Sequence, residues 1–214
     1  MAHLNLRKTS LRLSIALLAP FALAAQLHAQ ELTVSAAASL TNAFQAIGQA
    51  FEKAHPGSKI TFNFAASGPL LAQIQQGAPV DVFASADQET MDKAQAQGLL
   101  NDSSRKDFVQ NTLVVITPAN SRLKLDTLED LQQPALQRLA ISNPDSVPVG
   151  RYSKQALLDR QLWKALTEKM INTQNVRQSL DYVARDEVDA GFVYATDAAI
   201  MAEKVKVQFT VPLK

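Results

Sequence analysis

From residue 31 onward, short apolar runs alternate with longer stretches in which apolar residues recur at helical spacing. The pair Leu32 and Val34 comes first, and Leu40, Phe44 and Ile47 follow it. The first spacing places side chains on one face of a strand, and the second places them on one face of a helix. Because this alternation continues along the chain, it predicts an α/β fold.

The expected strands are separated by helical patterns and turn residues. They lie at residues 32–34, 59–64, 80–84, 113–116, 139–142, 191–194 and 205–211. Gly77 and Gly98 each follow a helical pattern, as glycine commonly does at helix ends. Asp126 with Glu129 three residues later indicates a helix start. Parallel α/β sheets bind ligands where strands end and helices begin, so loops 36–39, 65–68, 147–150, 175–176 and 194–197 are the places to examine.

Residues 1–29 have the pattern of a secretory signal peptide. Arg7, Lys8 and Arg12 precede an apolar run over residues 13–25, and small residues follow up to Ala29. The run is too short for a membrane span, which needs about 20 apolar residues, and we expect cleavage after Ala29. The sequence therefore predicts export to the periplasm.

The composition of the remaining chain excludes several classes of protein. Without residues 1–29 the chain has 18 basic and 20 acidic residues, which argues against a nucleic-acid partner. It contains no cysteine and retains His55 as its single histidine. Thiolate metal sites are therefore excluded, and neither a transition-metal cage nor a histidine-based catalytic triad is expected.

Two serines and a tyrosine lie where predicted strands end. Ser39 stands between a strand and a helix, and Ser67 precedes Gly68 and Pro69 in the same arrangement. Free amides and the positive end of the helix dipole make such points suitable for an anion, although each serine could simply cap its helix. Tyr194 ends a buried strand, where its hydroxyl either faces the ligand or bonds a carbonyl in the core. These donors, without a carboxylate in the two serine loops, suit a doubly charged oxyanion.

A hydrolytic alternative rests on two serine–lysine pairs. Ser103 with Lys106 and Ser121 with Lys124 have the minimal spacing of some serine hydrolases. Neither pair is accompanied by the further motifs of those enzymes, and both lie in polar stretches that are typical of surface. The sequence therefore favours binding without covalent chemistry.

Several segments together resemble the periplasmic molybdate-binding proteins of bacterial ABC transporters. The similar segments are AAASLTNAF (36–44), FAAS (64–67), GAPVDVF (77–83), SADQ (85–88), VY (193–194) and DA (197–198). The resemblance extends from about residue 32 to residue 209. It implies a two-domain α/β fold of the type II periplasmic binding protein class, with the ligand in a cleft between the domains.

The resemblance also implies a ligand and the residues that bind it. The ligand is molybdate or tungstate, held by the hydroxyls of Ser39, Ser67 and Tyr194 and by the main-chain amides of Val149 and Val176. No cofactor is implied, and the metal is bound only as its oxyanion. The implied partner is an inner-membrane ABC transporter permease, and such receptors are usually monomers. Sulfate or another tetrahedral anion is the alternative ligand, because the same donors would serve it.

The expected domain boundaries follow from the same resemblance. Residues 30–111 and 208–214 are expected to form the first domain, and residues 112–207 the second. The family's chains continue beyond the position equivalent to Lys214, so we expect the C-terminal part of the first domain to be missing from this sequence. A regulatory effector domain of similar architecture is less consistent with the chain, since it has a signal peptide and no DNA-binding helix-turn-helix.

Overall fold

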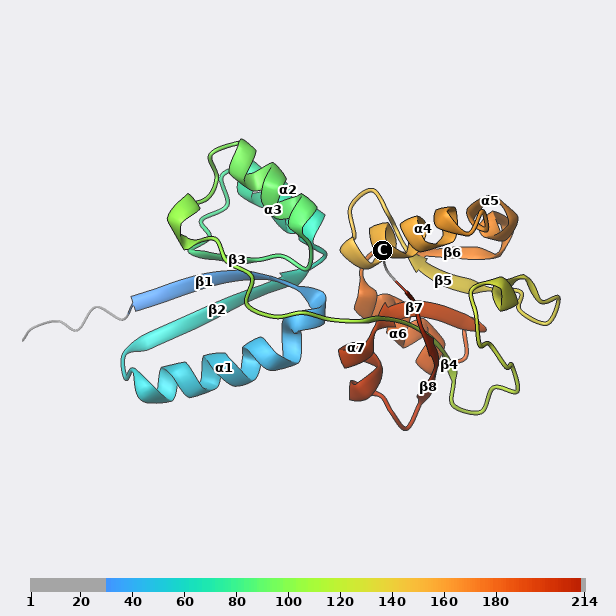
Figure 1. The fold of residues 1–214 in the computed structure, drawn as a ribbon. Helices are drawn as coiled ribbons and strands as arrows, with labels where there is room; N and C mark the ends of the chain where they lie inside the picture. Colours follow the sequence, from blue (N-terminus) through green and yellow to red (C-terminus); the bar gives the residue numbers. More distant parts are fainter. Residues whose placement is uncertain (1–29, 213–214) are drawn as a thin grey trace, which may run out of the picture.

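The computed structural model describes residues 30–212, which form two α/β units side by side (Figure 1). The predicted signal peptide and its cleavage site lie outside these residues. In the described part of the chain, no helix is both long and apolar enough to cross a membrane. An extended segment, residues 105–112, leads from the first unit to the second (Figure 1).

The first unit contains a parallel three-stranded sheet in the order β2-β1-β3. Figure 1 shows α1 on one face of this sheet and α2 and α3 on the other. Its elements are β1 (Gln30–Ala37), the 3-10 helix η1 (Ala38–Leu40), α1 (Thr41–Ala54), β2 (Ser58–Ala65), α2 (Ser67–Gln75), β3 (Val82–Ala84), α3 (Gln88–Ala96) and η2 (Asp102–Ser104).

The second unit contains a mixed five-stranded sheet in the order β6-β5-β7-β4-β8. Strands β5, β6 and β7 run parallel, whereas β4 pairs antiparallel with β7 and β8. Its elements are β4 (Leu113–Pro118), η3 (Glu129–Gln132), β5 (Leu139–Ser142), α4 (Pro148–Asp159), α5 (Trp163–Leu166), η4 (Thr167–Lys169), β6 (Met170–Thr173), α6 (Val176–Ala184), β7 (Ala190–Tyr194), α7 (Ala195–Ile200) and β8 (Val205–Thr210).

The two units differ in how much apolar surface they bury. Strands β4, β5 and β7 are buried along their whole length, as their unbroken apolar runs predict. In the first unit, the buried cluster consists of Val34, Ala36 and Ala84, with Phe44 and Phe62 packed partly exposed against it. Because burial of apolar surface is the main stabilising term, the second unit has the stronger core.

The structure confirms the α/β alternation and corrects three local expectations. Strand β3 begins at Val82, two residues later than predicted. No α-helix starts at Asp126, because Asp126 and Thr127 donate their backbone N–H groups to Asp130 and only η3 follows. These bonds also lower the pKa of the Asp130 carboxyl. Gly77 and Gly98 do follow helices, both with a positive φ, of 88° and 66°.

The third difference concerns the end of the chain. Residues 208–214 were expected in the first unit, but β8 pairs with β4 through Thr210. This pairing places residues 208–210 in the five-stranded sheet. Val205 and Val211, at the two ends of this segment, are buried against the second core, whereas Val207 between them is exposed.

Candidate anion-binding site

Six parallel strands from the two sheets end at one place between the units. In the first unit these are β1, β2 and β3, and in the second they are β5, β6 and β7. The loops and helix starts that follow these strands line a single small cavity. Its lining residues are Ala37, Ala38, Ser39, Ala66, Ser67, Ala86, Val147, Pro148, Val149, Asn175, Val176 and Tyr194.

The cavity is small and carries no charged side chain in its lining. Its volume is about 10 Å³. That is room for about one water molecule. Sugars, amino acids and other organic solutes are therefore excluded, and only a guest of a few atoms fits. All five residues predicted to contact an oxyanion (Ser39, Ser67, Val149, Val176 and Tyr194) are among the lining residues.

Tyr194 contributes a buried hydroxyl at the end of β7. The residue is 6% exposed, and its hydroxyl has no hydrogen-bond partner within the described residues. Burial raises the pKa of this hydroxyl well above 10, and the neighbouring Tyr152, Asp87 and Asp197 raise it further. The phenol therefore keeps its proton at neutral pH. An unpaired buried donor is costly to the fold unless a guest accepts its hydrogen bond.

The two serines present their hydroxyls from the first unit. Ser67 is fully buried at the start of α2, and its Oγ accepts the backbone N–H of Ala86 at 3.0 Å. That bond occupies a lone pair and leaves the hydroxyl hydrogen free to donate. Ser39 is half-buried in η1, and its hydroxyl has no partner within residues 30–212. Neither serine caps its own helix, so the capping alternative does not hold.

The second unit supplies main-chain donors from two helix starts. Helix α4 begins at Pro148, which has no N–H, so the first N–H group of the helix belongs to Val149. The preceding residue, Val147, makes no side-chain cap. Asn175 caps α6 by accepting the N–H of Gln178, as predicted, which leaves the amide of Val176 outside the cap. The helix dipoles place partial positive charge at the same ends. The cavity therefore offers hydroxyl and amide donors, and no charged side chain, to a guest anion.

Charged residues lie behind this lining rather than in it. Arg177 Nε is 2.7 Å from Asp197 Oδ1, and the Asp197 side chain is fully buried. Burial raises the pKa of Asp197 to about 6, against the opposing effect of the Arg177 guanidinium. The N–H of Tyr194 donates to the other carboxylate oxygen of Asp197. Asp197 lies in the first turn of α7, where its side chain forms part of a capping box with Tyr194.

A second ion pair was also missed by the sequence interpretation. Arg151 Nη2 lies 2.6 Å from Asp87 Oδ2, and Asp87 also caps α3, as expected. These partners are 64 residues apart in the sequence, so no local pattern could indicate the pair.

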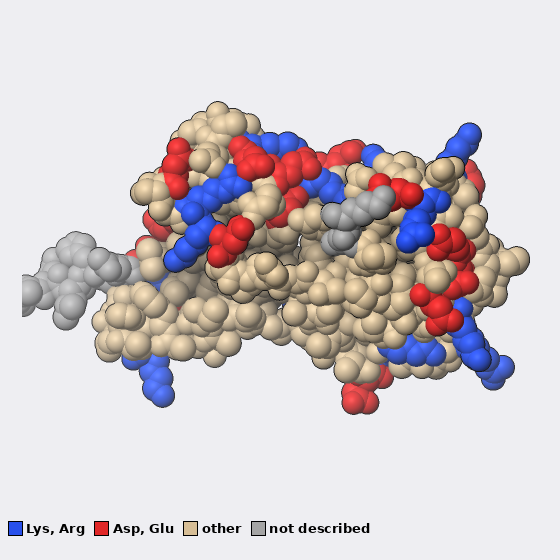
Figure 2. All heavy atoms as spheres, in the orientation of Figure 1, with Lys and Arg blue, Asp and Glu red and all other residues tan. Residues whose placement is uncertain are grey.

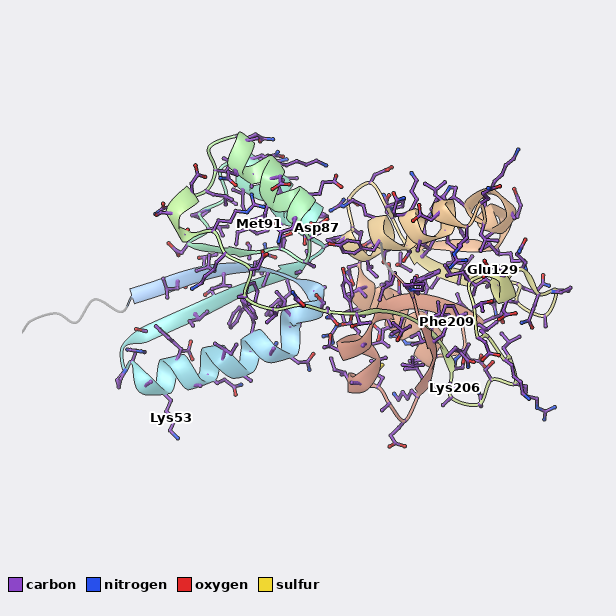
Figure 3. The ribbon with its side chains drawn as sticks, in the orientation of Figure 1. Lys53, Asp87, Met91, Glu129, Lys206 and Phe209 are labelled. Carbon is purple, nitrogen blue, oxygen red and sulfur yellow. The ribbon has the colours of Figure 1, made fainter. Side chains whose placement is uncertain are left out.

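A larger hollow lies beside β3 and the connecting segment. Its volume is about 790 Å³, and Phe44, Met91 and Phe108 line part of it. Figure 3 shows Met91 on α3 farther from the junction of the units than Asp87. Charged side chains of both signs line this hollow (Asp81, Asp87 and Asp107, with Arg105 and Lys106). The smaller cavity has only uncharged lining residues, and these include all five predicted contact residues. The smaller cavity is therefore the candidate anion site.

The serine–lysine pairs lie away from the small cavity. Ser103 is exposed and donates to Asn101 Oδ1, and Lys106 is exposed as well. The Ser121 hydroxyl accepts the N–H of Leu123, while Lys124 is exposed. Neither pair has the serine–lysine hydrogen bond that activates a nucleophile. Within residues 30–212, no group of three or more histidine, cysteine, aspartate or glutamate residues could hold a metal ion.

Comparison with solved structures places this arrangement among periplasmic binding proteins. A periplasmic molybdate-binding protein from Azotobacter vinelandii superimposes with a TM-score of 0.69 at 30% identity, covering 76% of this chain and 71% of that protein. The sulfate-binding protein SubI from Mycobacterium tuberculosis superimposes with a TM-score of 0.70 over 83% of this chain and 70% of its own. At 14% identity the second likeness shows the fold alone.

Sequence comparison gives the family. The molybdate-binding protein ModA of Escherichia coli K12 is 39% identical over 198 residues, which are 90% of this chain and 76% of that protein. The ModA of Haemophilus influenzae Rd is 35% identical, over 82% of this chain and 70% of its own length. For the ModA of Mycobacterium tuberculosis H37Rv, the chain spans 66% of the relative's length. Since residues 32–214 also match the model of the bacterial extracellular solute-binding proteins, the chain belongs to that family, as a relative of the ModA proteins.

Proposed function

We propose that the protein binds molybdate, and also tungstate, and delivers it to an inner-membrane ABC transporter permease. The observation that carries this proposal is the uncharged cavity, into which hydroxyl and amide donors from both units converge. Doubly charged oxyanions have only acceptors at neutral pH, so every polar group of the cavity can serve them. The names of the relatives from Escherichia coli and Haemophilus influenzae support molybdate as the ligand.

The donor set separates this ligand from phosphate. Phosphate groups retain a proton part of the time near neutral pH, and a carboxylate in the lining would be needed to accept it. No carboxylate lines the cavity. Sulfate lacks such a proton, so the cavity can distinguish it from molybdate and tungstate only by size. The oxygens of molybdate and tungstate lie farther from the central atom than those of sulfate. Sulfate is therefore the critical competitor.

The lining of the cavity supports a role for each of the five predicted residues. The hydroxyls of Ser39, Ser67 and Tyr194 donate to the oxyanion, together with the amides of Val149 and Val176. No lysine or arginine contacts the anion, since aligned amides and helix dipoles stabilise its charge in an enclosed site. No covalent step is involved. Closure of the two units over the anion removes water and creates the surface that the permease recognises.

The setting of this function is the periplasm. Residues 1–29 direct export, and the protein acts there as a monomer without a nucleic-acid partner. Figure 2 shows basic and acidic side chains intermingled on the face in view. Mass determination of the exported protein tests both the cleavage after Ala29 and the monomeric state.

Titration calorimetry of the chain without residues 1–29 tests the ligand directly. Molybdate and tungstate are expected to bind tightly, whereas sulfate and phosphate give no heat at the same concentrations. Ser39→Ala should weaken molybdate binding by about tenfold or more, because it removes a hydrogen bond to a charged group. Folded protein that gives no heat with molybdate or tungstate would overturn the proposal, and preferential binding of sulfate would change the ligand.

A further inference from the structure

Two arginines of the second unit reach across to the first unit. Arg151, in the first turns of α4, donates from Nε to Asp87 Oδ2 at 2.8 Å and from Nη2 to Thr90 Oγ1 at 2.8 Å. Both acceptors belong to the start of α3, and the Asp87 side chain is only 4% exposed. Figure 3 shows Asp87 at the junction of the two units. This contact therefore joins α4 to α3 across the cleft.

The second arginine makes an equivalent crossing on α6. Arg177 donates from Nη1 to Asn42 Oδ1 at 2.9 Å and from Nη2 to the carbonyl oxygen of Ser39 at 3.1 Å. Its Nε faces the buried carboxylate of Asp197, which anchors the side chain to the second unit. Arg177 thus connects the backbone of Ser39 to α7, the helix that follows Tyr194, and both Ser39 and Tyr194 are proposed to bind the oxyanion.

The two arginines share a position relative to the cavity. Arg151 comes two residues after Val149 and Arg177 comes one residue after Val176, so each is carried by a helix whose first amides line the cavity. Neither arginine lines the cavity itself, and both guanidinium groups have acceptors in the protein. We propose that Arg151 and Arg177 are clasps that hold the two units closed over the bound oxyanion.

This inference rests on the proposed function and assigns the arginines a role in retention rather than in contact with the anion. Binding of the anion at the helix starts brings α4 and α6 to the first unit, where the clasps then form. Because the clasp bonds join the two units, separation of the units must break them, and their loss should speed opening and release. Encounter with the open form should be little affected. Arg151 and Arg177 are thus positioning residues.

Variants on each side of the cleft test the clasps separately. Arg151→Met and Arg177→Met remove the guanidinium groups, but Arg177→Met also leaves Asp197 buried without its partner. Asn42→Ala and Thr90→Val therefore each remove one first-unit acceptor, of Arg177 and Arg151 respectively, and keep both buried carboxylates paired. The Ser39 carbonyl and the Asp87 carboxylate remain as acceptors in these variants. Arg185→Met is the matched control, since Arg185 follows α6 directly but pairs only with Glu187 at the surface.

Release is measured by loading the protein with radioactive molybdate and following retention on a filter after excess unlabelled molybdate is added. The arginine variants are expected to release about tenfold faster or more, and the acceptor variants about fivefold faster, with association rates unchanged within about twofold. The control should release at the wild-type rate. Wild-type release rates in all four variants would overturn the clasp inference.

Opening is measured independently of the ligand through spin labels. The chain has no cysteine, so Lys53→Cys and Lys164→Cys place one label on each unit without further changes. The clasp variants should populate longer label distances than the wild type, with and without molybdate. If wild-type protein retained no molybdate, the proposed function would fail, and these ligand-free distances would still decide the clasp inference. Unchanged distances in all four variants would overturn it.

Discussion

We expect Tyr194→Phe to make the ligand-free protein more stable and to weaken its binding of molybdate. The Tyr194 hydroxyl is buried and unpaired within the described residues. An unsatisfied buried polar group costs about 1–3 kcal/mol. We expect the lower end, about 1 kcal/mol, because opening of the units admits water. For a chain of this length such a gain raises Tm by about 2–4 °C.

The loss in affinity comes from the same hydroxyl. A hydrogen bond to a charged group contributes about 1.5–3 kcal/mol, which corresponds to roughly a 10- to 150-fold rise in Kd. The high pKa of Tyr194 keeps this donor protonated across the working pH range. Scanning calorimetry without ligand and titration calorimetry with molybdate measure the two quantities on the same preparation.

Tyr182→Phe provides the control for the loss of a phenol hydroxyl. Tyr182 lies on α6, and its hydroxyl accepts Gln178 Nε2 at 3.3 Å outside the cavity. That variant should lose a little stability and keep its affinity for molybdate. The reasoning is refuted if Tyr194→Phe binds molybdate as tightly as the wild type, or if it is destabilised as Tyr182→Phe is.

Three further predictions concern closure, pH and local stability. A Cβ at Gly68 would lie 2.4 Å from the Ser146 carbonyl oxygen of the other unit, so Gly68→Ala should keep the two units from closing fully. Small-angle scattering should show the wild type contracting when molybdate binds, and the variant not contracting. A variant that contracts as the wild type does contradicts this prediction. The pKa of Asp197 is about 6 in the folded protein, above its ordinary value of 3.8. As the pH falls from about 6 to about 4, the folded state therefore takes up a proton at this carboxylate. The cost of the buried charge to the stability of the fold, roughly 3 kcal/mol, is then removed. Chemical denaturation should therefore show Asp197→Asn gaining stability relative to wild type as pH rises from about 4 to about 7.5, and a constant difference would refute the prediction. In hydrogen exchange, amides of β1–β3 should exchange faster than those of β4 and β7, because the first unit buries less apolar surface; equal protection would contradict it.

The local elements could be predicted because their signals are contiguous in the sequence. The unbroken apolar run at residues 113–116 and the helix start at residues 175–176 depend on neighbouring residues only, and both are present in the structure. The sequence also placed Ser39, Ser67 and Tyr194 at strand ends, and the structure brings them to one cavity. Their role toward an oxyanion stays a prediction for calorimetry to test.

The contacts between the units could not be predicted from local patterns. Arg177 and Asn42 are 135 residues apart, and nothing near either residue indicates the other. The pairing of β8 with β4 was also missed, because a strand's alternation shows which face is buried but not which sheet it joins. Such contacts depend on how the two sheets come together, which is a property of the whole chain.

The small side chains of the cavity bear on how its selectivity can evolve. Ala37, Ala38, Ala66 and Ala86 line the cavity together with the proposed donors, two of which are the main-chain amides of Val149 and Val176. Substitution cannot remove a backbone N–H except by proline, so drift at these positions preserves the preference for anions. Each added methyl group instead reduces the radius of the anion that fits. Descendants of such a site can therefore change from one tetrahedral anion to another by steps in volume, without passing through a form that binds nothing.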